Sequence, residues 1–308
     1  MSVFPIAAGH PDWSAGKSIP ELFSAKMLIE FYESCFIPQI TNSDYEGEIK
    51  EKGDKVNIPI LPDIDVIDYE ANDTIDYPLL SPGNIALTVD KAKLWRYRVD
   101  KVMNHQSLVD WLAATVPHAT ERAKRTVERA FLADIYASAH ADNLGLTAGK
   151  ISSSYNLGVT GTPLQFTAAN SVEVITRLDA VLDEQDAPQE GRYAVISTWM
   201  GQKLKNSELR EANKTGDPKS TMRTGLIGKI GKIDIYESNL LKLVVDGADT
   251  CTNAIFGQKS AVCFASQFTD TRMGFELENT IGKASRGLQV YGYKAIKSEA
   301  LGHLYVKP

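Results

Sequence analysis

The stretch of this sequence best suited to hold a phosphate is Gly225–Lys232, which reads GLIGKIGK. Glycines let a backbone approach phosphate oxygens closely, and Lys229 or Lys232 would supply the balancing positive charge. The spacing fits neither the GxxxxGK[S/T] loop nor the GxGxxG loop, and the residues that follow alternate as in a strand. We therefore predict a tight turn that leads into a strand, and keep a nucleotide-binding enzyme as an alternative.

Residues that commonly carry catalysis or bind metals are scattered. The five histidines are far apart in sequence, and no HExxH, GxSxG or Ser-x-x-Lys motif with partners can be assembled. We expect His105 at the start of a helix and His303 in a terminal strand. Cys35, Cys251 and Cys263 form no CxxC pair, and their odd number argues against a disulfide framework. We therefore expect no catalytic residue, no metal site, no cofactor, and synthesis in a reducing, cytosolic compartment.

A dense group of carboxylates lies between residues 63 and 76. It lacks the Asx-x-Asx-x-Asx-Gly-x5-Glu pattern of a calcium loop. An extended segment of this length buries little of its own surface, so we expect it to lie against something else. The carboxylates belong to Asp63, Asp65, Asp68, Glu70, Asp73 and Asp76.

Two strand-like arms flank this acidic segment. In the first, residues 54–61, apolar and polar side chains alternate, and Pro59 predicts an edge strand because it cannot donate a ladder hydrogen bond. The second arm runs from Ile85 to Val102. Its apolar face holds Leu87, Val89, Trp95, Tyr97 and Val99, and its charged face includes Asp90, Arg96 and Arg98. The pattern predicts a projecting hairpin.

A long amphipathic helix is predicted over residues 105–140, where an apolar stripe recurs at three- and four-residue steps. Pro117 should start this helix or kink it. Glu121 precedes Arg125 at a favourable four-residue spacing. The polar face is either solvated or a docking surface for the acidic hairpin of a neighbouring copy. It holds Glu121, Arg122, Lys124, Arg125, Glu128 and Arg129.

The order of the remaining predicted elements indicates an α+β fold. A capping box at Ser18 starts a helix that ends before Pro38, and Thr167 and Thr198 are expected to cap two later helices. Further expectations are loops over 143–167, a helix to 184, short strands at 193–197, 232–236 and 243–245, a mobile loop over 203–219, a strand or helix over 253–268, and a central strand within 275–306.

Composition and charge limit the kinds of partner that the chain can bind. The chain has 308 residues, a formal net charge of -6 and a pI near 5.5, so it has no global basic field to condense nucleic acid. Any contact with a polyanion should be local and weak. No run of 18 apolar residues and no cationic leader is present, so we expect a soluble chain that is not exported.

Four stretches together resemble the major capsid proteins of tailed bacteriophages. They are Tyr45–Pro59 (YEGEIKEKGDKVNIP), Leu87–Lys93 (LTVDKAK), Gly228–Asn239 (GKIGKIDIYESN) and Arg286–Lys294 (RGLQVYGYK), with Asp134 in the long helix. Their order and spacing carry the resemblance, which spans nearly the whole chain.

The resemblance implies the Hong Kong 97 coat fold. It would comprise an N-terminal arm (1–45), an extended loop hairpin (46–102), a peripheral domain with the long spine helix (103–165 and 263–308) and an axial domain (166–262). Copies would form the hexamers and pentamers of an icosahedral head around double-stranded DNA, assembled in the bacterial cytoplasm. Implied partners are a separate scaffolding protein, a portal protein and in some cases a decoration protein.

Charge complementarity suggests how copies meet. We hypothesise that Asp65, Asp68 and Glu70 of one copy contact Arg122, Arg125 or Arg129 of the next. Exposed ion pairs contribute only about 0.2 to 1 kcal/mol each, so the hairpin's apolar face should supply most of the binding and the charges the register. An encapsulin-like nanocompartment shell, which encloses enzymes, is the alternative within the same fold.

Overall fold

The computed structural model describes residues 35–44, 55–60, 83–106, 111–207, 228–278 and 281–308, with positions 64, 66, 68 and 79. The helices are α1 (Ile37–Ile40), α3 (Lys101–Gln106), α4 (Trp111–Asp134), α5 (Ser171–Glu184) and α6 (Thr198–Lys205). The strands are β1 (Lys55–Ile60), β2 (Gly83–Thr88), β3 (Lys91–Asp100), β4 (Leu164–Gln165), β5 (Arg192–Ile196), β6 (Lys229–Ile230), β7 (Ile233–Glu237), β8 (Leu243–Asp246), β9 (Asp249–Gln258), β10 (Val262–Glu276), β11 (Gly282–Ala295) and β12 (Leu301–Lys307).

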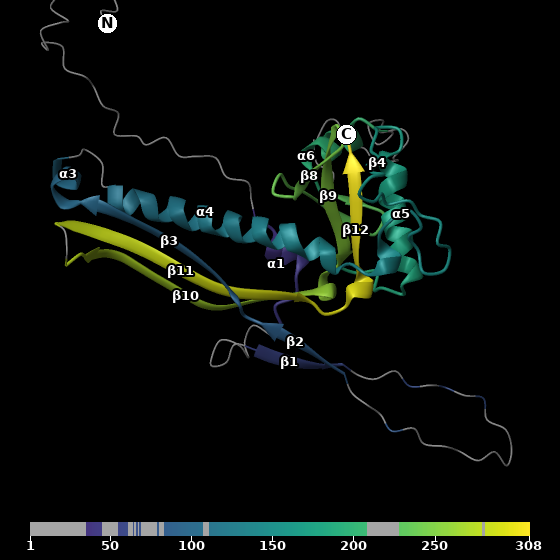
Figure 1. The fold of residues 1–308 in the computed structure, drawn as a ribbon, viewed down its shortest axis with the longest axis horizontal. Helices are drawn as coiled ribbons and strands as arrows, with labels where there is room; N and C mark the ends of the chain where they lie inside the picture. The colour runs from purple at the N-terminus through teal and green to yellow at the C-terminus, as the bar shows by residue number, and fades with distance from the viewer. Residues whose placement is uncertain are drawn as a thin grey trace, which may run out of the picture.

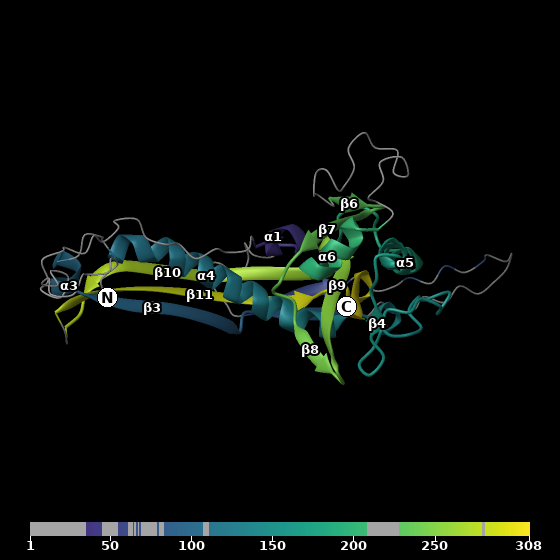
Figure 2. The same ribbon diagram turned by 90° about the horizontal axis from the view of Figure 1, so that it is seen from above.

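A long three-stranded antiparallel sheet forms one end of the molecule. Its order is β10–β11–β3, and α4 lies along one of its faces (Figures 1 and 2). Strand β11 is central, as predicted, because β10 and β3 occupy its two edges. Along β3, Trp95, Tyr97 and Val99 are half-buried while Arg96 and Arg98 are exposed, which confirms the predicted alternation.

A mixed sheet forms the other end, in the order β4–β12–β9–β5–β7–β6 with β8 paired to β9. Helices α5 and α6 pack on one face through a core that includes Leu178, Val181, Phe256 and Leu304. The opposite face joins α1 and the end of α4 in a second core. Every residue of β5 is buried, as expected for a strand covered on both faces.

The hairpin prediction is half right. Strands β1 and β2 pair antiparallel and project from the body as a stem (Figure 1). The second arm, however, does not continue to Val102 as one strand. It ends at Thr88, and β3 pairs with β11 instead of β1. The alternation of apolar and polar residues identified the strand and its two faces. It does not show which other strand it pairs with.

Other predicted boundaries shift by a few residues. Of the predicted helix over 105–140, α4 covers 111–134, and residues 107–110 lie outside the described part of the chain. Pro117 lies inside α4 and does not start it. His105 lies in the last turn of α3, not at a helix start. Pro38 lies in the first turn of α1. The predicted helix from Ser18 falls outside the described residues.

Two predicted N-caps are also displaced. Helix α5 follows Asn170, and Thr167 instead exchanges hydrogen bonds with Asn170: Thr167 N–H donates to Oδ1 at 2.8 Å and Asn170 N–H to Oγ1 at 3.3 Å. Helix α6 follows Ser197, one residue before the predicted Thr198.

The ambiguous segment 253–268 contains parts of two strands, β9 and β10, which belong to different sheets. No described helix has both the length and the apolar character needed to span a membrane.

Candidate subunit interface

Helix α4 is held to the three-stranded sheet by aromatic packing. Phe131 is fully buried and meets Tyr293 and Phe264 edge to face, with ring centroids 5.1 and 6.4 Å apart. The Tyr293 hydroxyl donates to Oδ2 of Asp134 at 2.7 Å, at the end of the helix. Burial raises the pKa of Tyr293, and Asp134 adds to the rise, so this hydroxyl stays protonated as a donor. The opposite face of α4 therefore has a fixed orientation.

That opposite face presents cations. Arg122 and Arg129 are exposed, and Arg125 is half-buried. Glu121 forms an ion pair with Lys124, three residues later, at 2.7 Å. The partner of Glu121 is therefore Lys124 and not Arg125, which the four-residue spacing predicted. The predicted cationic surface therefore lies on the side of α4 that faces away from the sheet.

Glu128 corrects the predicted polar face of α4. Its side chain is completely buried, and Oε2 accepts a hydrogen bond from the backbone N–H of Phe36 at 2.9 Å. Burial raises the pKa of the neighbouring Cys35 thiol to about 12, and the negative charge of Glu128 adds to the rise. Glu128 thus anchors the segment that precedes α1, and it is not available to a neighbouring copy.

The stem is fixed on the sheet face opposite α4. Ile58 of β1 and Leu87 of β2 are buried against Cys263 and Ala265 of β10, with Val290 of β11 packed beside them. Close approach requires a glycine in β11. A Cβ built on Gly292 would lie 2.1 Å from the carbonyl oxygen of Thr88, where no side chain fits. Beyond this cluster Ile60 is exposed, so the stem leaves the body near the end of β1.

The predicted acidic partners follow β1 in the sequence. Asp68 is an exposed, described position, and Asp65 and Glu70 lie outside the described residues. Two apolar neighbours are open to solvent, Ile64 at 67% and Val66 at 96% relative exposure. The contact between this segment and Arg122, Arg125 or Arg129 joins two copies, so it stays a prediction.

The described end of the glycine-rich stretch holds β6 and a tight turn that leads into β7, in line with the predicted turn before a strand. Gly231 has a φ of 59° between the paired strands β6 and β7, a backbone conformation that glycine adopts without strain. The Lys232 ammonium lies 3.0 Å from a carboxylate oxygen of Asp183 and is therefore committed to an ion pair within the chain. Residues 225–227 of the proposed phosphate loop lie outside the described part of the chain.

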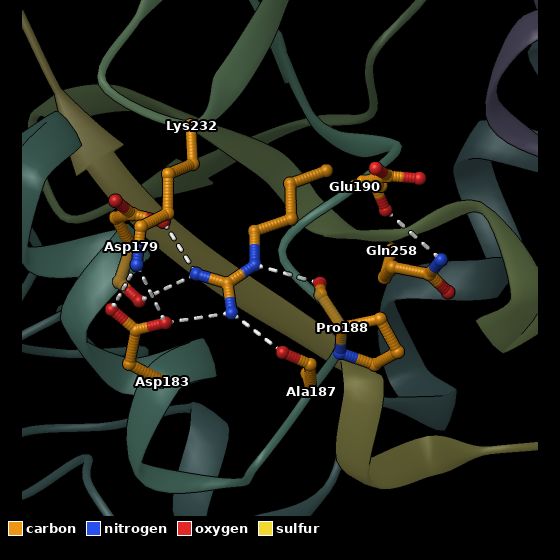
Figure 3. A network of polar contacts seen from close by, with 8 residues as sticks. Asp179, Asp183, Ala187, Pro188, Glu190, Lys232 and Gln258 are labelled. Atoms are coloured by element: carbon orange, nitrogen blue, oxygen red, sulfur yellow. Dashed lines mark hydrogen bonds and ion pairs between the residues drawn. The ribbon is translucent and has the colours of Figure 1, made fainter.

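Asp183 belongs to a larger network around the fully buried Arg192 (Figure 3). The guanidinium donates to Oδ1 of Asp179 at 2.5 Å and to the carbonyls of Ala187 and Pro188 at 2.6 and 3.0 Å, and its ion pair with Asp183 is 2.7 Å long. Although burial acts to raise the pKa of Asp183, hydrogen bonds from Lys232 and Arg192 hold it below its ordinary value. The network ties α5, the turn before β5 and the β6–β7 turn together.

The remaining histidine and cysteine residues are possible metal ligands. In the part of the chain that the structure describes, however, no three histidine, cysteine or carboxylate side chains converge on a metal position. His303 lies in β12, as predicted, with Nε2 3.0 Å from Oδ1 of Asn253. All three cysteines are free thiols.

Comparison with solved structures identifies the fold. A chain from Mycobacterium phage Che8 superimposes with a TM-score of 0.76 at 23% identity, covering 93% of this chain and 97% of its own. Cyanophage Pam1, in a capsid asymmetric unit, gives 0.71 at 13% identity with 99% of both chains covered. The capsid of Cyanophage P-SCSP1u gives 0.70 at 13%, covering 98% and 96%. No protein-family model and no curated sequence matches the chain.

This protein has the phage capsid fold. The likeness runs over nearly the full length of both chains in each pair, so the α+β class predicted from the sequence is confirmed.

Within this capsid fold, sequence reasoning missed one arrangement of charges. Strand register places Arg272 of β10 opposite Arg286 of β11, and Arg286 opposite Arg96 of β3. All three side chains are exposed. We call these three residues the arginine row. Long stretches of sequence separate β3 from β10 and β11, so only the register of the capsid fold brings the row together.

Proposed function

We propose that this chain is the major capsid protein of a tailed bacteriophage, with a structural and non-enzymatic role in the virion. The observation that carries the proposal is the near full-length likeness to chains of phage structures, at TM-scores of 0.70 to 0.76. The projecting stem and the charged surfaces support it, because both suit contact with neighbours more than chemistry on a small molecule.

Copies of the chain would form hexamers and pentamers that close into an icosahedral shell around double-stranded DNA. The stem and its cationic receiver are different surfaces, so the contact would be head to tail, and such a contact closes into a ring when its rotation permits. Many weak contacts of this kind give a stable shell through multivalency while each stays reversible. The net charge of -6 suits a lining that does not grip the packaged genome tightly.

The parts of the shell would follow the division expected from the sequence. We propose an N-terminal arm over 1–45, an extended loop over 46–102, a peripheral domain over 103–165 and 263–308, and an axial domain over 166–262. A scaffolding protein, a portal protein and a decoration protein are the partners proposed for assembly in the host cytoplasm.

The first test is negative-stain microscopy of the purified full-length chain, alone and with a candidate scaffolding protein, at two salt concentrations. Shells, capsomer rings or curved sheets are the expected result. A monodisperse monomer or dimer under every condition would contradict the proposal. In that case the nucleotide-binding alternative at Gly225–Lys232 would be tested by ATP and GTP binding.

An encapsulin-like nanocompartment is the second candidate, because the same fold suits a shell that encloses enzymes. Purified particles discriminate the two. Nuclease-protected DNA inside particles made during infection supports the phage head, whereas a co-purifying enzyme that remains inside the washed shell supports the nanocompartment.

A further inference from the structure

A cleft opens between α1, α4 and the long sheet. Its volume is about 600 Å³, which lies within the range of roughly 300 to 1,000 Å³ that small-molecule sites in proteins occupy. Val127 of α4 and Phe264 of β10 form one part of its apolar lining, and Ile37 and Pro38 of α1 form another. We call this hollow the α1 cleft. It is large enough for a ligand with a substantial apolar body.

The walls of the α1 cleft are held in place by hydrogen bonds from the backbone. At one end of α1, the N–H of Phe36 is bound to Glu128 of α4. At the other end, Asn42 N–H donates to the carbonyl of Val262 at 2.8 Å, and Phe264 N–H donates to the carbonyl of Asn42 at 2.9 Å. The segment that carries α1 is therefore tied to both α4 and β10. A ligand would meet a preformed site, so little conformational freedom would be lost on binding.

Two polar side chains of the lining are available to a ligand. Gln289 of β11 lines the cleft from the sheet, and Ser43 lines it just after α1. Among the described residues, neither side chain makes a hydrogen bond, whereas the Thr41 hydroxyl donates to the carbonyl of Ile37 at 2.7 Å. The Gln289 amide can both donate and accept. A ligand oxygen beside it would therefore gain a hydrogen bond without breaking one inside the protein.

The charged residues of the cleft already neutralise each other. Glu121 and Lys124 of α4 both line it, and they form an ion pair at 2.7 Å. A charged ligand would face one like charge and would have to compete for the other. The Cys35 thiol, also in the lining, stays protonated because burial raises its pKa to about 12. The lining therefore favours a ligand without net charge.

We propose that the α1 cleft binds an uncharged small molecule with a mostly apolar body and one amide, ketone or alcohol oxygen set against Gln289. The apolar lining would take the body, and the Gln289 amide would fix its orientation. The inference goes beyond the proposed function, because it assigns a ligand site to a subunit with a structural role. A bound molecule would contact α1, α4, β10 and β11 together, so it would stabilise the folded subunit.

N-benzylbutanamide is a suitable probe, because it places one neutral amide between two apolar groups. Its binding to the full-length, unassembled chain is measured by ligand-observed NMR, and we expect a Kd of roughly 0.1 to 1 mM for a molecule of this size. Saturating probe should also slow the reaction of Cys35 with a disulfide reagent about threefold or more, because it covers the thiol. No binding, or binding that leaves the Cys35 rate unchanged, would overturn the proposal.

Two variants test the lining. Gln289→Leu nearly keeps the size of the side chain but removes its amide, and should weaken binding of the probe about two- to tenfold through the loss of one hydrogen bond. Val127→Phe fills the cleft and should weaken binding about tenfold or more. Gln202→Leu makes the first change on the exposed side of α6 and should leave binding unchanged. Melting curves show which variants fold, and Gln289→Leu decides if Val127→Phe does not. Equal binding by Gln289→Leu and the parent chain would contradict the inference.

A charged analogue tests the class of ligand. N-benzylbutylamine has nearly the same shape as the probe but carries an ammonium in place of the amide. It should bind about threefold more weakly or worse, because it lacks the carbonyl oxygen that Gln289 would bind. If it binds more tightly than the amide, the cleft selects a cation and the inference is wrong.

A neighbouring copy is the other occupant to test. Binding of the probe to both the free subunit and assembled shells supports the proposal. Binding to the free subunit that is lost in shells would show that a protein segment fills the cleft, which would overturn it. Shell formation is scored separately, so failure of the chain to assemble would contradict the proposed capsid function and not this inference.

Discussion

The backbone N–H of Phe36 donates a hydrogen bond to Oε2 of Glu128 at 2.9 Å, deep in the body of the protein. The Phe36 ring stacks on Tyr236 of β7 with centroids 5.5 Å apart. A few residues later, Asn42 N–H donates to the carbonyl of Val262 at 2.8 Å. The segment 35–44 therefore touches α4, β7 and β10 at once, and it joins the long sheet to the mixed sheet.

Glu128→Ala should loosen this junction. The substitution leaves the Phe36 N–H buried without its acceptor, which costs about 1 to 3 kcal/mol in free energy of unfolding. Glu128→Gln keeps an acceptor oxygen and should cost less. Urea unfolding of the unassembled chain measures both, and Thr126→Ala, on the exposed side of α4, should stay within about 0.5 kcal/mol of the parent.

Cys35 gives a local readout of the same junction. Burial, with the charge of Glu128 added, raises the pKa of its thiol to about 12, so in the parent chain very little thiolate is present at pH 8. Removing the carboxylate lowers this pKa and admits solvent, so we expect faster reaction with a disulfide reagent in Glu128→Ala. Cys251 and Cys263 are fully buried and serve as internal references. An unchanged Cys35 rate would mean that Glu128 does not hold the segment.

Arg192 should be the most sensitive polar residue of the mixed-sheet end. Removing one partner from a buried charge network costs about 3 to 5 kcal/mol, because Asp179 would lose its counter-charge and Asp183 would keep only Lys232. Arg192→Lys should also destabilise the fold strongly, since an ammonium cannot reproduce the forked guanidinium contacts to Ala187 and Pro188. Thermal unfolding measures the loss.

Lys232→Met is the matched control for Arg192. The Lys232 pair with Asp183 is partly exposed, with side-chain exposures of 37% and 42%, so its removal should cost no more than about 1 kcal/mol. Equal destabilisation by Lys232→Met and Arg192→Lys would mean that the buried contacts of Arg192 contribute nothing beyond a surface ion pair.

Local periodicity predicted the elements whose identity depends on nearby residues. The buried stripe of α5, namely Val174, Ile175, Leu178, Val181 and Leu182, is buried as predicted, and so is β5. Helix α4 was predicted for the same reason: Val127 and Phe131 share one face of the helix, and both are buried with Ile135, which follows the last residue of α4.

Features set by distant residues could not be predicted in this way. Glu128 falls on the polar face by helical spacing, yet it is buried because Cys35 and Phe36 cover it. Strand β3 has the alternation of a hairpin arm, but its partner β11 lies about 190 residues later in the chain. The arginine row has no sequence signal at all, since it exists only once β3, β10 and β11 are in register.

His303 should make the stability of the subunit depend on pH. Burial lowers its pKa to about 4, below the ordinary value of 6.5, as the ring packs beside Tyr136 and Tyr305. A depressed histidine favours the neutral form, so its contribution is complete above pH 6.5 and is lost as the pH falls toward 4. We expect a loss of about 1 to 3 kcal/mol over this range, measured by urea unfolding.

His303→Gln provides the control for this pH dependence. Glutamine can still donate to Oδ1 of Asn253, which lies 3.0 Å from His303 Nε2, but it does not titrate. The variant should be less stable than the parent at pH 7 and should show a flatter profile between pH 6.5 and 4. A variant profile that falls as steeply as that of the parent would assign the pH dependence to other groups.

Charge reversal on α4 tests the second cationic surface. If Asp65, Asp68 or Glu70 of one copy meets Arg122, Arg125 or Arg129 of the next, Arg125→Glu should raise the subunit concentration needed for assembly about two- to fivefold at low salt, and the effect should fade as salt screens the pair. Light scattering during assembly measures this concentration. Arg286→Glu, assayed in parallel, reverses a charge on the opposite face of the sheet. Assembly and a salt dependence that are unchanged by Arg125→Glu would contradict the predicted contact with α4.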